Sequence, residues 1–103
     1  MVALFTTAAY AATIYGTSGN DQLDETMGDD DIHGWRGADT LDASLYGHDK
    51  DRLYGNRGPD KLYANDGDQS GGEFDYVNGG RGWDVCYGDP EDTFRRCQEV
   101  YTN

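Results

Sequence analysis

The chain has 103 residues, 20 of them acidic and 8 basic, and its formal net charge is −12 at pH 7. This balance argues against a nucleic acid or an anionic membrane as partner, because phosphates would be repelled. The length indicates one domain, and with 36% hydrophobic residues a conventional core would be thin. So many carboxylates indicate either a cation-binding protein or a disordered acidic chain.

Residues 1–12 are small and mostly apolar, and Ala9-Tyr10-Ala11 has the form of a signal-peptidase site. No basic segment precedes this site, and the apolar run is short for a complete signal. We interpret residues 1–12 as the remnant of a secretory signal, with a disordered N-terminus as the alternative. The prediction is a secreted protein of bacterial type without membrane insertion, since no stretch approaches transmembrane length.

A nine-residue repeat occupies residues 13–87. The string Gly-x-Asp-x-apolar occurs at residues 19–23, 28–32, 37–41, 58–62 and 82–86. Residues 51–53 and 75–77 keep only the Asp and the apolar residue. Gly and Asp favour turns, and a single apolar residue between two polar neighbours is typical of a short strand. Such a strand buries its apolar side chain only when successive coils stack, so the repeat predicts a solenoid.

These residues match the nonapeptide G-G-x-G-x-D-x-U-x, and residues 79–84 carry its complete turn. The chain therefore resembles the RTX, or hemolysin-type, calcium-binding repeat family over residues 13–87. The resemblance implies an all-β fold, a right-handed parallel β-roll of about four coils in which two nonapeptides form each coil. It also implies that residues 88–103 form a C-terminal cap.

Two nonapeptides per coil place alternate turns on opposite edges of the roll. Counted from Gly16, the odd segments 16–24, 34–42, 55–63 and 79–87 are all nine residues long, whereas insertions of three and six residues fall in the even segments 43–54 and 64–78. We therefore expect a regular edge, formed by the odd turns, and a bulged edge, formed by the even turns. Our interpretation is that the regular edge holds the best metal sites.

Stacked aspartates would bring two carboxylates to each gap between coils, which is repulsive unless a cation lies there. Calcium prefers about six to eight oxygen ligands, whereas magnesium keeps its water and demands a strict octahedron. We predict about three to five calcium ions, whose binding drives folding outside the cell. The candidate carboxylates are Asp21, Asp39, Asp60 and Asp84 on the regular edge and Asp30, Asp51 and Asp75 on the bulged edge.

The resemblance also implies backbone carbonyl ligands, from the second and fourth residues of one turn and the first and third residues of the turn stacked on it. The insertions leave the carbonyls of the bulged edge unassigned. On the regular edge the implied pairs are Thr17 and Gly19 with Gly34 and Arg36, Trp35 and Gly37 with Gly55 and Arg57, and Asn56 and Gly58 with Gly79 and Arg81.

The two cysteines, Cys86 and Cys97, lie near the C-terminus. An even number of cysteines in a short chain with secretory features favours a disulfide. Zinc would need more ligands than these, and a catalytic thiol would need a neighbouring base. We therefore predict a disulfide that staples the cap.

Two further features leave alternatives open. Arg36, Arg57 and Arg81 occupy the third position of three odd turns, either as charge compensation beside the aspartates or as an anion-binding ladder. Outward tyrosines such as Tyr54 and Tyr63 are good strand formers, or else a face for a glycan or protein partner. No catalytic motif is present. The sequence predicts a monomeric, non-enzymatic calcium-binding protein, with a calcium-stabilised recognition module as the alternative.

Overall fold

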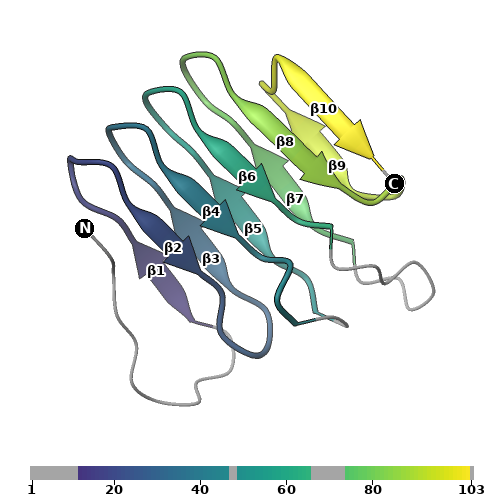
Figure 1. Cartoon of the computed structure of the whole chain (residues 1–103). Coiled ribbons are helices and arrows are strands. Elements are labelled where there is room, and N and C mark those ends of the chain that lie inside the picture. The colour runs from purple at the N-terminus through teal and green to yellow at the C-terminus, as the bar shows by residue number, and fades with distance from the viewer. Residues whose placement is uncertain (1–11, 47–48, 66–73, 103) are drawn as a thin grey trace.

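The computed structural model describes residues 12–46, 49–65 and 74–102, which form a parallel β-solenoid of short strands (Figure 1). Most of the segment interpreted as a signal remnant, residues 1–11, lies outside the described residues. The described residues contain no helix, and so none that is long and apolar enough to cross a membrane. The strands are β1 (Thr13–Tyr15), β2 (Gln22–Asp24), β3 (Asp31–His33), β4 (Thr40–Asp42), β5 (Arg52–Tyr54), β6 (Lys61–Tyr63), β7 (Tyr76–Asn78), β8 (Val85–Gly88), β9 (Thr93–Arg95) and β10 (Glu99–Thr102).

The strands alternate between two sheets, so that each coil contributes one strand to each sheet. One sheet has the order β1-β3-β5-β7-β9 and the other β10-β8-β6-β4-β2, and all neighbours are parallel. Figure 1 shows the two layers facing each other, with the coils stacked from the N-terminal to the C-terminal end. The predicted parallel β-roll is confirmed.

The core lies between the sheets and consists of two columns of apolar side chains. Each three-residue strand from β1 to β7 buries its central residue, because neighbouring side chains of a strand point to opposite faces. The register pairs each central residue with its counterpart one coil away. The fully buried columns are Ile14, Ile32, Leu53 and Val77 in one sheet and Leu23, Leu41, Leu62 and Cys86 in the other.

The C-terminal residues extend both sheets by one strand. Phe94 in β9 pairs with Val77, and Val100 in β10 pairs with Cys86, so both apolar columns continue into residues 88–103. Phe94 is partly buried against the core, whereas Val100 is 43% exposed at the end of the column. The predicted disulfide between Cys86 and Cys97 is confirmed, and it ties β8 to the turn that precedes β10.

Candidate metal centre

The turns between strands lie on two edges of the solenoid. The regular edge consists of the connections 16–21, 34–39, 55–60 and 79–84, each of which has six residues. The bulged edge consists of the connections 25–30, 43–51, 64–75 and 89–92, which differ in length. Both predicted insertions lie on the bulged edge, because each sheet receives every second strand.

A ladder of aspartates runs along the regular edge. The backbone N–H of Asp21 donates to Asp39 Oδ1 at 2.8 Å, and the same contact links Asp39 to Asp60 and Asp60 to Asp84 at 2.9 Å. The ladder ends where Asp84 N–H donates to Gln98 Oε1. All four aspartates are buried. One oxygen of each carboxylate, except that of Asp21, therefore ties its coil to the coil before it.

The second oxygen of the interior carboxylates has no such donor. Within the described residues, Oδ2 of Asp39, Asp60 and Asp84 is buried and accepts no hydrogen bond. At the first coil, by contrast, the N–H and hydroxyl of Thr17 donate to Asp21. Buried polar atoms without a partner are rare and costly, so these three oxygens are candidate ligands for a cation.

Backbone carbonyls lie beside these oxygens. A β-carbon placed on Gly55 would lie 2.5 Å from Asp60 Oδ2 and 2.6 Å from the carbonyl oxygen of Gly79 in the next coil. Gly34 and Gly79 have the same arrangement with Asp39 and Asp84. The first residue of each of these turns must therefore be glycine, because any side chain would fill the space where carboxylate and carbonyl oxygens converge.

Burial raises the pKa of the interior carboxylates. Desolvation, followed by the charges of Asp84 and Asp39, raises the pKa of Asp60 to about 8. Desolvation raises the pKa of Asp39 and of Asp84 to about 6. Burial also acts on Asp21, but the hydrogen bonds from Thr17 lower its pKa. The edge therefore resists ionisation in the absence of a cation.

The bulged edge carries a second aspartate ladder. The N–H groups of Asp30, Asp51 and Asp75 donate to Oδ1 of Asp51, Asp75 and Asp92, respectively, at 2.8–2.9 Å. Asp92 was not among the carboxylates predicted for this edge. The repeat pattern could have indicated it, because Asp92 precedes Phe94 by two residues, just as Asp75 precedes Val77.

Three carboxylates of the bulged edge converge in one place. Oxygens of Glu25, Asp49 and Asp51 all lie within 4.8 Å of one another. Glu25 and Asp49 are 5% exposed and Asp51 is fully buried. Within the described residues, Glu25 Oε2, Asp49 Oδ1 and Asp51 Oδ2 accept no hydrogen bond. Sequence reasoning missed Glu25 as a ligand, because Glu25 replaces a leading glycine. It offered Asp49 only as an additional loop ligand, because Asp49 lies in an insertion.

The pKa shift of Asp51, in this cluster, is the largest in the site. Desolvation and the neighbouring Glu25 raise the pKa of Asp51 to about 10. Desolvation raises the pKa of Glu25 to about 7, and that of Asp49 also rises. Three buried carboxylates within reach of one another are stable as anions only with a cation between them.

Several predicted carbonyl ligands hold neighbouring coils together. The carbonyl of Trp35 accepts the N–H of Arg57 at 2.8 Å, and the carbonyl of Asn56 accepts that of Arg81 at 2.7 Å. The carbonyl of Gly37 faces Gly58 of the next coil, where a β-carbon would meet it. A carbonyl oxygen has two lone pairs, so these contacts leave room for a further ligand bond. The assignment of individual carbonyls to calcium stays a prediction.

The outward aromatic side chains stack on one another. Tyr63, Tyr87 and Tyr101 form one ladder, with ring centroids 4.6 and 5.3 Å apart. His33 and Tyr54 stack at 4.7 Å in the other sheet. Because neighbouring rings already cover these faces, the arrangement favours a role in strand pairing over a flat surface for sugars.

The family model of the RTX calcium-binding nonapeptide repeat matches residues 8–41, 47–68 and 69–93, with four copies of the repeat. No match was found among the curated proteins or the solved structures. The matched residues contain both aspartate ladders up to Asp92 and the cluster of Glu25, Asp49 and Asp51.

Proposed function

The chain belongs to the RTX calcium-binding nonapeptide repeat family, and on that premise we propose that it is a secreted protein whose β-solenoid folds when about three to five calcium ions bind between stacked turns. The family supports calcium binding by a β-roll. The number of ions, their coupling to folding and the secretion belong to the proposal.

The observation that carries the proposal is the set of buried carboxylate oxygens without a hydrogen-bond donor. Those of Asp39, Asp60 and Asp84 recur once per coil on the regular edge. Each lies where carbonyl oxygens of the turns also converge. The donors are therefore carboxylate and carbonyl oxygens, which are the ligands that calcium prefers.

A second donor set supports a site on the bulged edge. Glu25, Asp49 and Asp51 would hold the ion there through three carboxylates. A site with more negative ligands binds calcium more tightly, so we expect this site to fill early in a titration.

Folding would depend on calcium because the ionised carboxylates within each aspartate ladder repel one another. At low calcium the unfolded chain separates these charges, whereas the folded chain brings them together in a buried place. Millimolar calcium outside a cell matches the affinity of about 10⁻⁴–10⁻³ M that is typical of extracellular modules. The disulfide also suits an oxidising compartment.

A far-UV circular dichroism titration tests the proposal. With the disulfide intact, calcium should convert a spectrum of disordered chain into one of β-structure, cooperatively and reversibly by chelator. Magnesium at equal concentration should leave the spectrum disordered, because it keeps its water ligands. A β-spectrum that chelation leaves unchanged would contradict the proposal, since the apolar columns and the disulfide would then suffice.

A further inference from the structure

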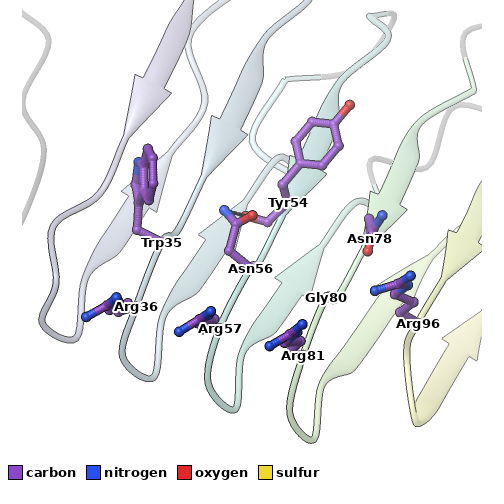
Figure 2. A pocket seen from close by; sticks show the side chains of 9 residues that line it. All are labelled: Trp35, Arg36, Tyr54, Asn56, Arg57, Asn78, Gly80, Arg81 and Arg96. Atoms are coloured by element: carbon purple, nitrogen blue, oxygen red, sulfur yellow. Dashed lines mark hydrogen bonds between the residues drawn. The ribbon is translucent and has the colours of Figure 1, made fainter.

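A groove lined by arginines runs beside the turns of the regular edge. Arg36, Arg57 and Arg81 follow one another at the third position of successive turns, and Arg96 lies in the next coil (Figure 2). The groove has a volume of about 530 Å³. Among the described residues no acidic side chain lines it, whereas four of the chain's 8 basic residues do. The remaining lining residues are Trp35, Tyr54, Asn56, Asn78 and Gly80.

The guanidinium groups of these arginines have no hydrogen-bond or ion-pair partner in the described part of the chain. Arg52 forms an ion pair with Asp31 at 2.7 Å, whereas no ion pair or side-chain hydrogen bond within residues 12–46, 49–65 and 74–102 involves the four guanidinium groups of the groove. All four side chains are exposed. Charge compensation beside the aspartates, one of the two readings of the sequence, would therefore act here without direct ion pairs, which leaves the guanidinium groups available to a ligand.

The stacking of the coils brings these like charges close together. Neighbouring strands of a sheet lie about 4.8 Å apart, so successive turns present one guanidinium group at about that spacing. Cations held in such a row repel one another, and calcium bound to the aspartates would add to that repulsion. An anionic ligand that carries charges at a similar spacing would remove it.

We propose that this groove binds a linear anionic polysaccharide that carries a carboxylate or sulfate group on each sugar. The spacing between coils is close to the length of one sugar in an extended chain, so successive anionic groups would meet successive arginines. The planar guanidinium group binds carboxylate and sulfate oxygens through two parallel hydrogen bonds. The amides of Asn56 and Asn78 lie in the same groove and suit sugar hydroxyls.

Trp35 gives independent support for a ligand. Its backbone has φ = 72°, in the left-handed region, where a bulky residue is unusual and costs stability. Gly80 takes the same position two coils later with φ = 85°, so the turn itself favours glycine there. The Trp35 side chain is 52% exposed and lines the groove. The ring contacts Tyr15 only in a tilted arrangement, with centroids 6.3 Å apart, and it does not belong to the buried core. A strained, half-exposed aromatic residue outside the core is expected at a binding surface, where its ring packs against a sugar.

The groove does not suit a single-stranded nucleic acid. Proteins bind such strands by stacking successive bases on several free aromatic rings. The second ring of this groove, that of Tyr54, is already stacked on His33 with an angle of 7° between the planes.

Isothermal titration calorimetry on the calcium-saturated full chain tests the proposal, with circular dichroism of the same samples as proof of folding. The probes are chondroitin sulfate and hyaluronan octasaccharides, which carry an anionic group on every sugar and on every second sugar, and an oligothymidylate of equal charge. We expect chondroitin sulfate to bind at least about fivefold more tightly than hyaluronan, and the oligothymidylate more weakly than either.

Two substitutions with the same change of charge distinguish specific binding in the groove from non-specific electrostatic attraction. Arg57→Gln should weaken chondroitin sulfate binding about tenfold, because it removes one charge-assisted pair from the middle of the row. Arg52→Gln should change it less than about twofold, because Arg52 already pairs with Asp31 outside the groove. Absence of binding by the folded protein, equal losses in both variants, or a preference for the oligothymidylate would each overturn the proposal. A chain that stays unfolded in calcium would instead contradict the calcium-driven folding proposed above.

Discussion

The two edges of the solenoid are built from the same repeat but differ in the first residue of each turn. On the regular edge this residue is always glycine, at positions 16, 34, 55 and 79, and carboxylate and carbonyl oxygens occupy the space of the missing side chain. On the bulged edge the corresponding residues are Glu25, Ala43, Ala64 and Asp89. The methyl groups of Ala43 and Ala64 are fully buried and join the core. The regular edge therefore reserves this position for oxygen ligands, whereas the bulged edge uses it for packing at Ala43 and Ala64 and for a carboxylate at Glu25 and Asp89.

The edges also differ in how they distribute charge. The regular edge places one carboxylate in each coil, and the pKa values of Asp39, Asp60 and Asp84 rise to about 6, 8 and 6. The bulged edge gathers Glu25, Asp49 and Asp51 in one place, where the pKa of Asp51 rises to about 10. Regular repeats thus give a series of similar sites, and an insertion gives one site of higher charge. The cluster on the bulged edge is therefore a second candidate for the tightest site, beside the regular edge that the sequence favours.

The largest effect should come from pH, because protons act on both edges at once. In the unfolded chain these carboxyl groups titrate near pH 4. In the calcium-free fold the pKa is about 6 for Asp39, about 7 for Glu25 and about 8 for Asp60. Between these values the folded state binds more protons than the unfolded state, so the free energy of unfolding falls as pH rises from about 4 to about 8.

Far-UV circular dichroism in calcium-free buffer at about pH 5 and about pH 8 checks this expectation, with more β-structure at the lower pH. With saturating calcium the dependence of stability on pH should reverse, because the metal-bound carboxylates must be deprotonated. A calcium-free β-content that does not change with pH would contradict the raised pKa values of the buried carboxylates.

A smaller effect is expected from a methyl group on the regular edge. Gly55→Ala would place a β-carbon 2.6 Å from the backbone carbonyl oxygen of Gly79, and the coils would have to separate. We expect a loss of about 3 kcal/mol in the calcium-loaded state and a weaker response to calcium. Gly19→Ala is the matched control, because no atom lies closer than 3.7 Å to its β-carbon. Calcium-loaded chemical denaturation measures both, and equal stabilities would show that the first position of the regular turns does not require glycine.

The next effect concerns the carboxylate cluster of the bulged edge. Asp51→Asn keeps the oxygen that accepts the N–H of Asp30 but removes one of three neighbouring carboxylates. We expect the calcium-free fold to gain about 2 kcal/mol near neutral pH, because an uncompensated buried acid is gone. Calcium should then bind more weakly. Asp24→Asn, on the exposed side of β2, removes the same charge and should change neither quantity.

Calorimetric calcium titration, and far-UV circular dichroism of the two calcium-free variants as a measure of their β-content, test these expectations. If Asp51→Asn left the tightest calcium affinity unchanged, the cluster would not bind the first ion, and the regular edge would hold the best sites, as the sequence suggested.

The fold could be predicted from the sequence because its period is strict. A nine-residue spacing puts Ile14, Leu23, Ile32 and Leu41 at the centre of successive strands, and the insertions lengthen turns without shifting this register. The columns then follow from stacking, since no other arrangement buries one apolar residue per strand. The continuation into β9 was harder to see, because Phe94 follows Val77 by 17 residues and the glycines of the repeat are missing there.

The site could be predicted only where it repeats. The aspartates of both ladders share the offset from the apolar residue, and the structure brings them together as expected. The cluster of Glu25, Asp49 and Asp51 has no period, because it depends on where Asp49 and Asp51 lie relative to Glu25 of the preceding coil. A local pattern carries no information on that placement, so only the three-dimensional structure shows the convergence.

The smallest effect separates binding from stability at one residue of the regular edge. Trp35→Gly removes a side chain from a backbone with φ = 72°, so we expect the calcium-loaded protein to gain about 1 kcal/mol, the cost of the left-handed conformation less the entropy of glycine. The same change should weaken chondroitin sulfate binding, since it removes the exposed ring of the arginine groove. Trp83→Gly is the matched control, because Trp83 has no positive φ and donates a hydrogen bond to Glu99, so its loss should destabilise. If Trp35→Gly destabilised the fold as Trp83→Gly does, Trp35 would be a packing residue, and the strain at this turn would need another cause.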